Sequence, residues 1–249
     1  MSRRDDVNQL YKYSNYLARF ESVLFWLDII AGVIAVFGNV QVSAFAIMIQ
    51  IVVAVLYFVS NAADDGYFWY RAEKARRKNN IENGLGTRLS EFETEEYYNN
   101  QINPSIEKYA LNSLGSNYFS KNIAGKMILG SCIKSVFAII VLIIACRFVQ
   151  DSELLLIIAQ TALSSYVLLD TVMLIFYKVR LDSLFDEGYA IMISQRIKGK
   201  GKNASLLAYS VEYEAIKAHY KIRLDEKSFK NENQRLSAEW ERILEHCEQ

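Results

Sequence analysis

Several residue types that support particular chemistries are scarce in this sequence. It holds one proline, Pro104, which lies outside the long apolar runs, so no proline is placed to unwind a helix there. Three cysteines, two in an apolar run and one in the tail, are too few for a disulfide framework. The two histidines, His219 and His246, lack cysteine or carboxylate neighbours at metal-binding spacing, and we interpret His219 as a helix-face residue. We therefore expect no metal site.

An excess of charge of either sign is also missing. The chain has 28 Lys and Arg residues and 28 Asp and Glu residues. Its net charge therefore gives no overall positive potential that would attract nucleic acid. No nucleophile motif is present, and Gly84-Leu85-Gly86 is too short for a phosphate loop. The first apolar run starts too late for a secretory signal and is not followed by a small-residue cleavage site. We expect no enzymatic activity, no cofactor and no nucleic-acid partner.

Apolar residues are abundant instead, and they concentrate in two blocks, roughly residues 23–59 and 128–177. A short polar break divides each block, at residues 38–41 and at residues 150–153, so each block predicts a hairpin of two helices. About 20 apolar residues cross a bilayer core. Buried helices of a soluble protein are the alternative, but residues 42–59 contain no charge and one strongly polar residue, Gln50. The prediction is an all-α membrane protein with four spans, at residues 22–37, 42–60, 128–149 and 154–177.

Lysine and arginine lie before, between and after the two blocks and are almost missing from the hairpin tips. The positive-inside rule then places both termini and the central segment in the cytoplasm. The predicted organisation is a cytoplasmic amino-terminal helix (1–21), a transmembrane hairpin (22–60), a cytoplasmic helical connector (61–127), a second transmembrane hairpin (128–177) and a long helical cytoplasmic tail (178–249).

Three charged residues fall inside the predicted spans. Asp28, Lys134 and Asp170 each lie about 8 to 9 Å from the cytoplasmic end of their span at 1.5 Å per residue, so they share one layer. A carboxylate in hydrocarbon needs a partner, and we expect Asp28 to meet Lys134 across the two hairpins. Each span also has a small or polar face. That face either packs helices together or lines an aqueous path, and its polar residues are Asn39, Gln50, Gln160, Ser164 and Thr171.

Aromatic residues followed by a basic run end the first hairpin. This order is typical of a membrane-interface anchor, although a nucleotide site could also use it. The anchor residues are Tyr67, Phe68, Trp69, Tyr70, Arg71, Lys74, Arg76 and Arg77.

The connector and the tail are predicted to be mostly helical. In the connector Tyr97, Tyr98, Tyr109, Tyr118 and Phe119 are expected to pack on neighbouring helices, or to line a ligand or partner site. The tail predicts a long amphipathic helix from about residue 203, with a break around residues 227–233 and a flexible basic hinge at residues 196–202. We expect this helix either to pack on the connector or to hold protomers together in an oligomer. Its apolar seam is Leu207, Val211, Ala215, Ala218, Ile222, Phe229, Leu236, Trp240 and Ile243.

Between its two apolar hairpins the chain carries the connector phrases ADDGYFWYRAEKARRKNNIENGLGTRL, EYYNN and NYFSKNIAGKM. In these features it resembles the SMODS-associating four-transmembrane effectors and the related SLATT effectors of bacterial conflict systems. The resemblance implies a homo-oligomeric protein of the bacterial inner membrane. Such effectors permeabilise or depolarise the membrane, causing abortive infection, when a cyclic nucleotide or a soluble sensor protein triggers them. On this hypothesis Asp28, Lys134 and Asp170 hold the closed bundle together, and Gln50, Gln160 and Ser164 face the conduit. A membrane scaffold that recruits a soluble partner and a small proton-coupled transporter are the alternatives.

Overall fold

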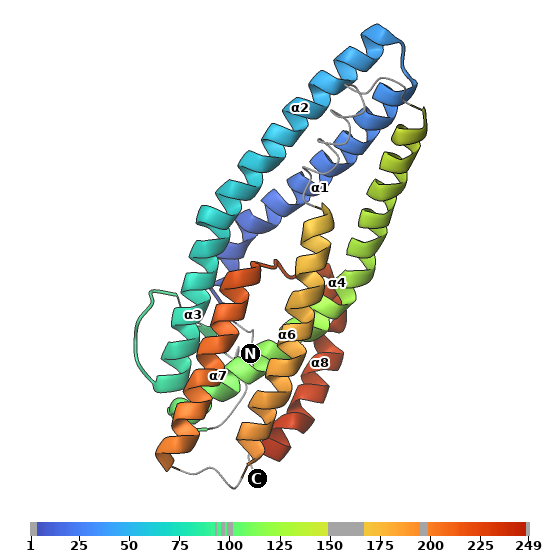
Figure 1. Cartoon of the computed structure of the whole chain (residues 1–249). Coiled ribbons are helices and arrows are strands. Elements are labelled where there is room, and N and C mark those ends of the chain that lie inside the picture. The colour runs from blue at the N-terminus through green and yellow to red at the C-terminus, as the bar shows by residue number, and fades with distance from the viewer. Residues whose placement is uncertain are drawn as a thin grey trace. The chain divides into compact units, whose positions relative to one another are not determined.

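The computed structural model of the chain describes residues 4–92, 94–95, 98, 102–148, 167–194 and 199–247 (Figure 1). Every described element longer than two residues is a helix, which confirms the predicted helical class. Two short strands, β1 (Arg4–Asp5) and β2 (Thr94–Glu95), pair antiparallel. The helices are α1 (Asn8–Phe37), α2 (Val40–Ala63), the π-helix η1 (Asp64–Phe68), α3 (Trp69–Leu85), α4 (Ile106–Phe148), α6 (Val167–Ile193), α7 (Gly199–Tyr220) and α8 (Glu226–Cys247).

Three helices are long and apolar enough to cross a membrane. They are α1, the continuous run Val40–Leu85, and the part Ile106–Ile144 of α4. In the most apolar stretch of α4 only 11% of the residues are buried, and large side chains such as Leu129 and Ile133 face outward. Contiguous exposed apolar surface of this kind is typical of contact with lipid. Most of the predicted fourth span, residues 154–166, lies outside the described residues.

The chain divides into two compact units. We call the first the apolar unit (Gln9–Arg71 and Gly130–Val172) and the second the polar unit (Met1–Asn8, Ala72–Leu129 and Met173–Gln249). Helices α1, α3, α4 and α6 each contribute residues to both units.

In the apolar unit α1 and α2 form an antiparallel pair, because a tight turn at Gly38 and Asn39 joins them (Figure 1). The Asn39 Oδ1 atom accepts a hydrogen bond from the Val42 N–H at 3.0 Å and so caps the first turn of α2. The Ser43 hydroxyl donates back to the Ala35 carbonyl at 2.9 Å. Small clusters such as Leu24 with Val53 and Tyr57 fill the interface.

In the polar unit the core lies among α4, α6, α7 and α8. Its most buried members include Leu114, Leu181, Leu206, Tyr213 and Leu236. A second contact joins α3 to α4, where a Cβ atom at Gly84 would stand 2.6 Å from the Tyr109 Cα atom. Glycine is therefore required at position 84 for these two backbones to approach so closely.

The helical tail was predicted correctly in type and wrongly in detail. Helix α7 ends at Tyr220, where Lys221 adopts a φ of 49°, and α8 begins at Glu226, so the break precedes residues 227–233. Asp225 caps the amino terminus of α8, since its Oδ2 atom accepts a hydrogen bond from the Ser228 N–H at 2.7 Å. Residues 199–202 belong to α7 and are not a hinge, and residues 196–198 lie outside the described residues.

The predicted apolar seam is wrong in α7 and correct in α8, where Phe229 and Ile243 are partly buried against the core beside two buried seam residues. Leu207 and Val211 are 46% and 59% exposed, whereas Tyr209 and Tyr213 beside them are buried. Helix α7 has apolar residues on two faces, and the tyrosines bury more area in the core than Leu207 and Val211 would. In α8 the expected residues Leu236 and Trp240 are buried.

Candidate functional site

A row of buried polar side chains connects α1 to α2 inside the apolar unit. The Ser14 hydroxyl donates to the Asp64 Oδ2 atom at 3.0 Å, and the Ser60 hydroxyl donates to the Glu21 Oε1 atom at 3.2 Å. Farther along, the Gln50 Nε2 atom donates to the Asp28 Oδ1 atom at 3.4 Å. We call these three pairs the polar ladder; its residues are Ser14, Glu21, Asp28, Gln50, Ser60 and Asp64.

The ladder follows from the spacing of α1 and the direction of α2. Ser14, Glu21 and Asp28 are seven residues apart, and two helical turns bring such residues to one face. Because α2 runs antiparallel, the partners Asp64, Ser60 and Gln50 occur in descending order. Asp64 is the first residue of the π-helical turn η1, a type of distortion that is frequent at functional sites.

Three of the six ladder residues are carboxylates, and all three are buried. Glu21 and Asp28 are each 5% exposed and Asp64 is 0% exposed. Burial of a carboxylate in an apolar helix pair is costly unless hydrogen bonds, a proton or a cation compensate it. In each pair a neutral hydroxyl or amide donates to the carboxylate.

The pair of Asp28 and Gln50 is the deepest in the apolar sequence, and its hydrogen bonding is incomplete. Gln50 is 2% exposed, and its Nε2 atom also reaches the Asp28 carbonyl at 3.3 Å. Its Oε1 atom is buried without a hydrogen-bond donor among the described residues. A Cβ atom at Gly32 would stand 3.0 Å from the Nε2 atom, so the glycine leaves room for the amide.

The expected charge layer is not assembled in the described part of the chain. Asp28 bonds to Gln50, and among the described residues Lys134 makes no ion pair with it. Lys134 is half-buried on α4, and Asp170 is exposed at the start of α6. The neighbour of Asp170, Thr171, is buried, and its hydroxyl lies 2.6 Å from that of Ser131 and 2.7 Å from that of Ser135.

Of the residues predicted to pack helices or line a path, Gln50 and Thr171 are buried in helix contacts, and Asn39 is the cap of α2. Gln160 and Ser164 lie outside the described residues. Four ladder residues, Ser14, Glu21, Ser60 and Asp64, were not among the predicted site residues. The seven-residue spacing that leads from Asp28 back to Glu21 and Ser14 was the available signal.

The predicted interface anchor is divided among different environments. Tyr67 and Tyr70 are 57% and 54% exposed, and Arg71 and Lys74 are exposed as well, as an interfacial role requires. Phe68 is half-buried and Trp69 is buried.

The other two basic anchor residues are engaged within the polar unit. Arg76 binds the Asp5 carboxylate through two nitrogens at 3.1 and 2.8 Å, and Arg77 binds Glu214 at 3.0 Å. Because their guanidinium groups are ion-paired, Arg76 and Arg77 are less available to bind anionic lipid headgroups than Arg71 and Lys74.

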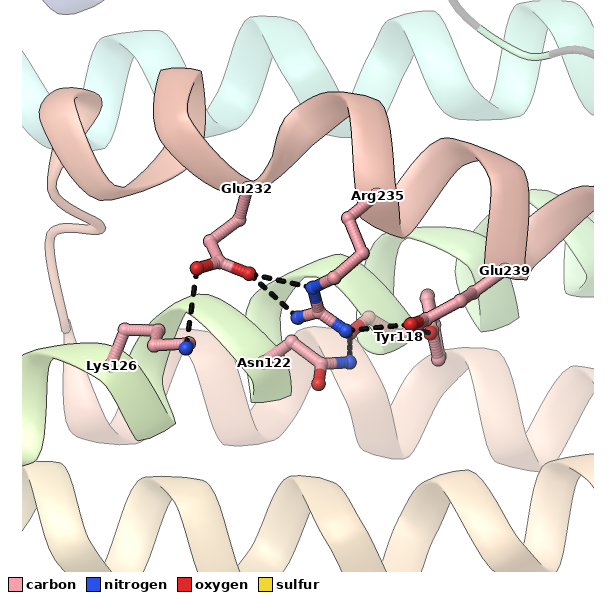
Figure 2. Close-up of polar contacts among 6 residues, drawn as sticks. All are labelled: Tyr118, Asn122, Lys126, Glu232, Arg235 and Glu239. Carbon is pink, nitrogen blue, oxygen red and sulfur yellow. Dashed lines mark hydrogen bonds and ion pairs between the residues drawn. The ribbon is translucent and has the colours of Figure 1, made fainter.

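A second polar cluster joins α4 to α8 in the polar unit (Figure 2). The Tyr118 hydroxyl donates to Glu239 at 2.5 Å, and Lys126 pairs with Glu232 at 3.2 Å. Arg235 lies between the two carboxylates and bonds Glu232 and Glu239, each at 2.7 Å. We call this cluster the α4–α8 clasp; its residues are Tyr118, Lys126, Glu232, Arg235 and Glu239.

The clasp favours the charged form of its carboxylates. Hydrogen bonds from Arg235 and Lys126 lower the pKa of Glu232 below its ordinary value, and those from Tyr118 and Arg235 lower the pKa of Glu239.

The connector aromatics behave largely as packing residues. Tyr109 and Tyr118 are buried, and Phe119 is half-buried against the same core, as one of the two expectations required. Tyr98 is half-buried, and Tyr97 lies outside the described residues.

Across the residues that the structure describes, no cluster of three or more histidine, cysteine, aspartate or glutamate side chains could hold a metal ion. Comparison of the chain with protein-family models, with curated proteins and with solved structures finds no match.

Proposed function

We propose that this protein is an inner-membrane effector of a bacterial defence system, which oligomerises and permeabilises or depolarises the membrane when a sensor triggers it. The observation that supports permeation is the polar ladder, three buried carboxylates along one interface of helices whose other faces are apolar; the defence role follows from the resemblance of the connector sequence. Ionisable residues within membrane helices are costly and are retained mainly along ion or proton paths.

The proposed topology has four spans, with both termini and the polar unit in the cytoplasm. The large cytoplasmic part receives the signal, either a cyclic nucleotide or a soluble sensor protein. Because α4 and α6 contribute residues to both units, a rearrangement of the polar unit can bias the packing of the apolar unit.

Opening then means exposing the ladder carboxylates to water. In the closed pair the hydroxyls of Ser14 and Ser60 and the amide of Gln50 bind the three carboxylates and hold α1 against α2. Several protomers are needed, because two helices alone cannot enclose an aqueous path. Separation or rotation of α1 within an oligomer would turn the carboxylates toward a conduit that attracts cations.

Cation leak from proteoliposomes of purified protein tests the proposal, with a panel of cyclic nucleotides added on the side of the tail. We expect a triggered leak in the wild type. The Ser60→Ala variant should leak without a trigger, because Glu21 loses a donor that holds the closed pair. The matched control is Ser210→Ala; this fully buried serine of the polar unit has its described hydrogen bond within its own helix, so the variant should leave the leak unchanged.

Absence of leak from the wild type and from Ser60→Ala under every condition would contradict the proposal and favour a scaffold, whose soluble partner should then co-purify in a fixed ratio. Saturable, substrate-coupled flux that Asp170→Asn uncouples would indicate a transporter instead.

A further inference from the structure

The buried polar atoms of the pair of Asp28 and Gln50 are incompletely compensated. Asp28 is 5% exposed, and the hydrogen bonds that its carboxylate receives among the described residues come from one amide at the long distance of 3.4 Å. Gln50 is 2% exposed and has an Oε1 atom without a donor. A buried carboxylate that lacks charge compensation and a buried carbonyl oxygen that lacks a donor are each unfavourable.

One proton on the Asp28 carboxyl group removes the uncompensated charge and supplies a donor for Gln50 Oε1, at the loss of the Nε2 bond to the Asp28 carbonyl. The acid form is neutral, so it no longer requires a counter-charge in the apolar pair, and its O–H group is a donor of the kind that Gln50 Oε1 lacks. Rotation of the Gln50 amide turns Oε1 toward that O–H group, and a Cβ atom at position 32 would crowd the amide at 3.0 Å.

A bound metal cation fits the pair less well. Hard cations take about six oxygen ligands. Here the described side-chain oxygens are those of Asp28 and Gln50, and nearby Phe25 and Ile29 pack in an apolar cluster with Ala138 of α4. A proton needs only one donor and one acceptor.

Among the described residues, few charged groups surround the pair. On α1 the nearest carboxylate of the ladder is Glu21, two turns away, and α2 carries no charged residue between Val40 and Ala63. On α4, which packs against α1 through Ala138, the charged residue nearest to Ala138 along the helix is Lys134, half-buried and without an ion pair to Asp28 among the described residues. None of these groups supplies the missing compensation at contact distance.

We propose that Asp28 and Gln50 form a proton-binding site within the helix pair, in which the acid form of Asp28 donates to the Gln50 amide oxygen. The site rests on the proposed membrane location of α1 and α2, and it gives the proposed effector a proton-dependent element. It stands whether or not the protein conducts ions, because its test does not use flux.

Dicyclohexylcarbodiimide, an apolar reagent that reacts with protonated carboxyl groups, tests this proposal on the full chain in proteoliposomes. Mass spectrometry locates the adduct. We expect labelling of Asp28 ahead of Glu21 and Asp64, whose carboxylates each accept a bond from a serine hydroxyl. Labelling of Asp28 should fall about tenfold for each pH unit above the point where the carboxyl ionises.

Two variants separate a proton site from mere burial. Gln50→Leu removes both the described donor to the carboxylate and the proposed acceptor of the acid proton, so the pH at which labelling of Asp28 falls should differ from that of the wild type. Ser43→Ala, which removes a buried hydroxyl bonded to backbone carbonyls on the same helix pair, should leave the pH profile unchanged. Circular dichroism of each variant confirms that the helices form.

Absence of an Asp28 adduct at every pH in folded protein would overturn the proposal. So would labelling that is equal at Asp28, Glu21 and Asp64, or an identical profile in Gln50→Leu. Protection of Asp28 by sodium ions at constant pH would assign the pair to a cation instead. Each outcome is independent of the leak measurement, so failure here and failure of the effector function remain distinguishable.

Discussion

Carboxylates of this protein occupy two contrasting environments. In the polar ladder, neutral hydroxyls and an amide bind Glu21, Asp28 and Asp64 inside an apolar helix pair. In the α4–α8 clasp, Glu232 and Glu239 bind Arg235, and Lys126 and Tyr118 complete the cluster. The clasp carboxylates are stabilised as anions by cationic partners, whereas the hydrogen bonds described for the ladder carboxylates come from neutral donors, which are weaker.

The clasp predicts that the polar unit loses stability in acid. Glu232 and Glu239 have a pKa in the folded protein that lies below their ordinary value of 4.5. A group whose pKa is lowered by folding adds stability above its unfolded pKa, and this contribution is lost as the pH falls through the folded pKa. The melting temperature of the detergent-solubilised protein should therefore drop as the pH is lowered below 4.5.

The double variant Glu232→Gln with Glu239→Gln is the matched comparison. It should melt at a lower temperature than the wild type at neutral pH and should show a smaller further loss in acid. Equal acid sensitivity of the two proteins would contradict the role of the clasp.

At the scale of secondary-structure elements, close approach of α3 and α4 depends on one glycine. A Cβ atom at position 84 would meet the Tyr109 Cα, Cβ and N atoms at 2.6, 2.6 and 3.0 Å. These are mostly backbone atoms and cannot rotate away, so the two helices would have to separate.

Gly84→Ala should therefore destabilise the polar unit by about 1 to 3 kcal/mol, the usual cost of overpacking, despite the better helix propensity of alanine. Chemical denaturation followed by circular dichroism measures the loss. Gly125→Ala is the matched control within α4, because its nearest neighbour is the flexible end of the Lys178 side chain at 3.7 Å. A control as unstable as Gly84→Ala would show that the cost does not arise from the contact with α4.

At the scale of the whole molecule, the proposed topology places the turn between α1 and α2 outside the cell and the tail inside. Val40, at the start of α2, is 87% exposed, and Lys227, at the start of α8, is exposed as well. Both positions can carry a reporter cysteine without disturbing a core.

In a background without the native cysteines, Val40→Cys should react with a membrane-impermeant maleimide applied to spheroplasts, and Lys227→Cys should react only after permeabilisation. Gel shift of the labelled protein measures the reaction. The reverse pattern would invert the orientation, and equal labelling of both positions in intact spheroplasts would contradict a membrane-spanning hairpin.

The local features of the fold were predictable because they depend on periodicity and composition. Long apolar runs in α1, α2 and α4 specify helices that could cross a membrane whatever their neighbours are. The turn at Gly38 and Asn39 was visible as a polar break, since an asparagine before an apolar run is a strong helix cap. The buried positions of Tyr109 and Tyr118 were likewise expected from their aromatic character.

Choices between comparable partners were decided by tertiary structure alone. The depth of Asp28 predicted a contact with Lys134, but the packing of α1 on α2 brings Asp28 to Gln50 instead. Helix α7 had two apolar faces, and the core accepted the tyrosines and left Leu207 and Val211 exposed. Composition and spacing determine which helices form and which residues share a face. The register between helices determines which faces and charges meet, because it depends on close contacts such as that of Gly84 with Tyr109.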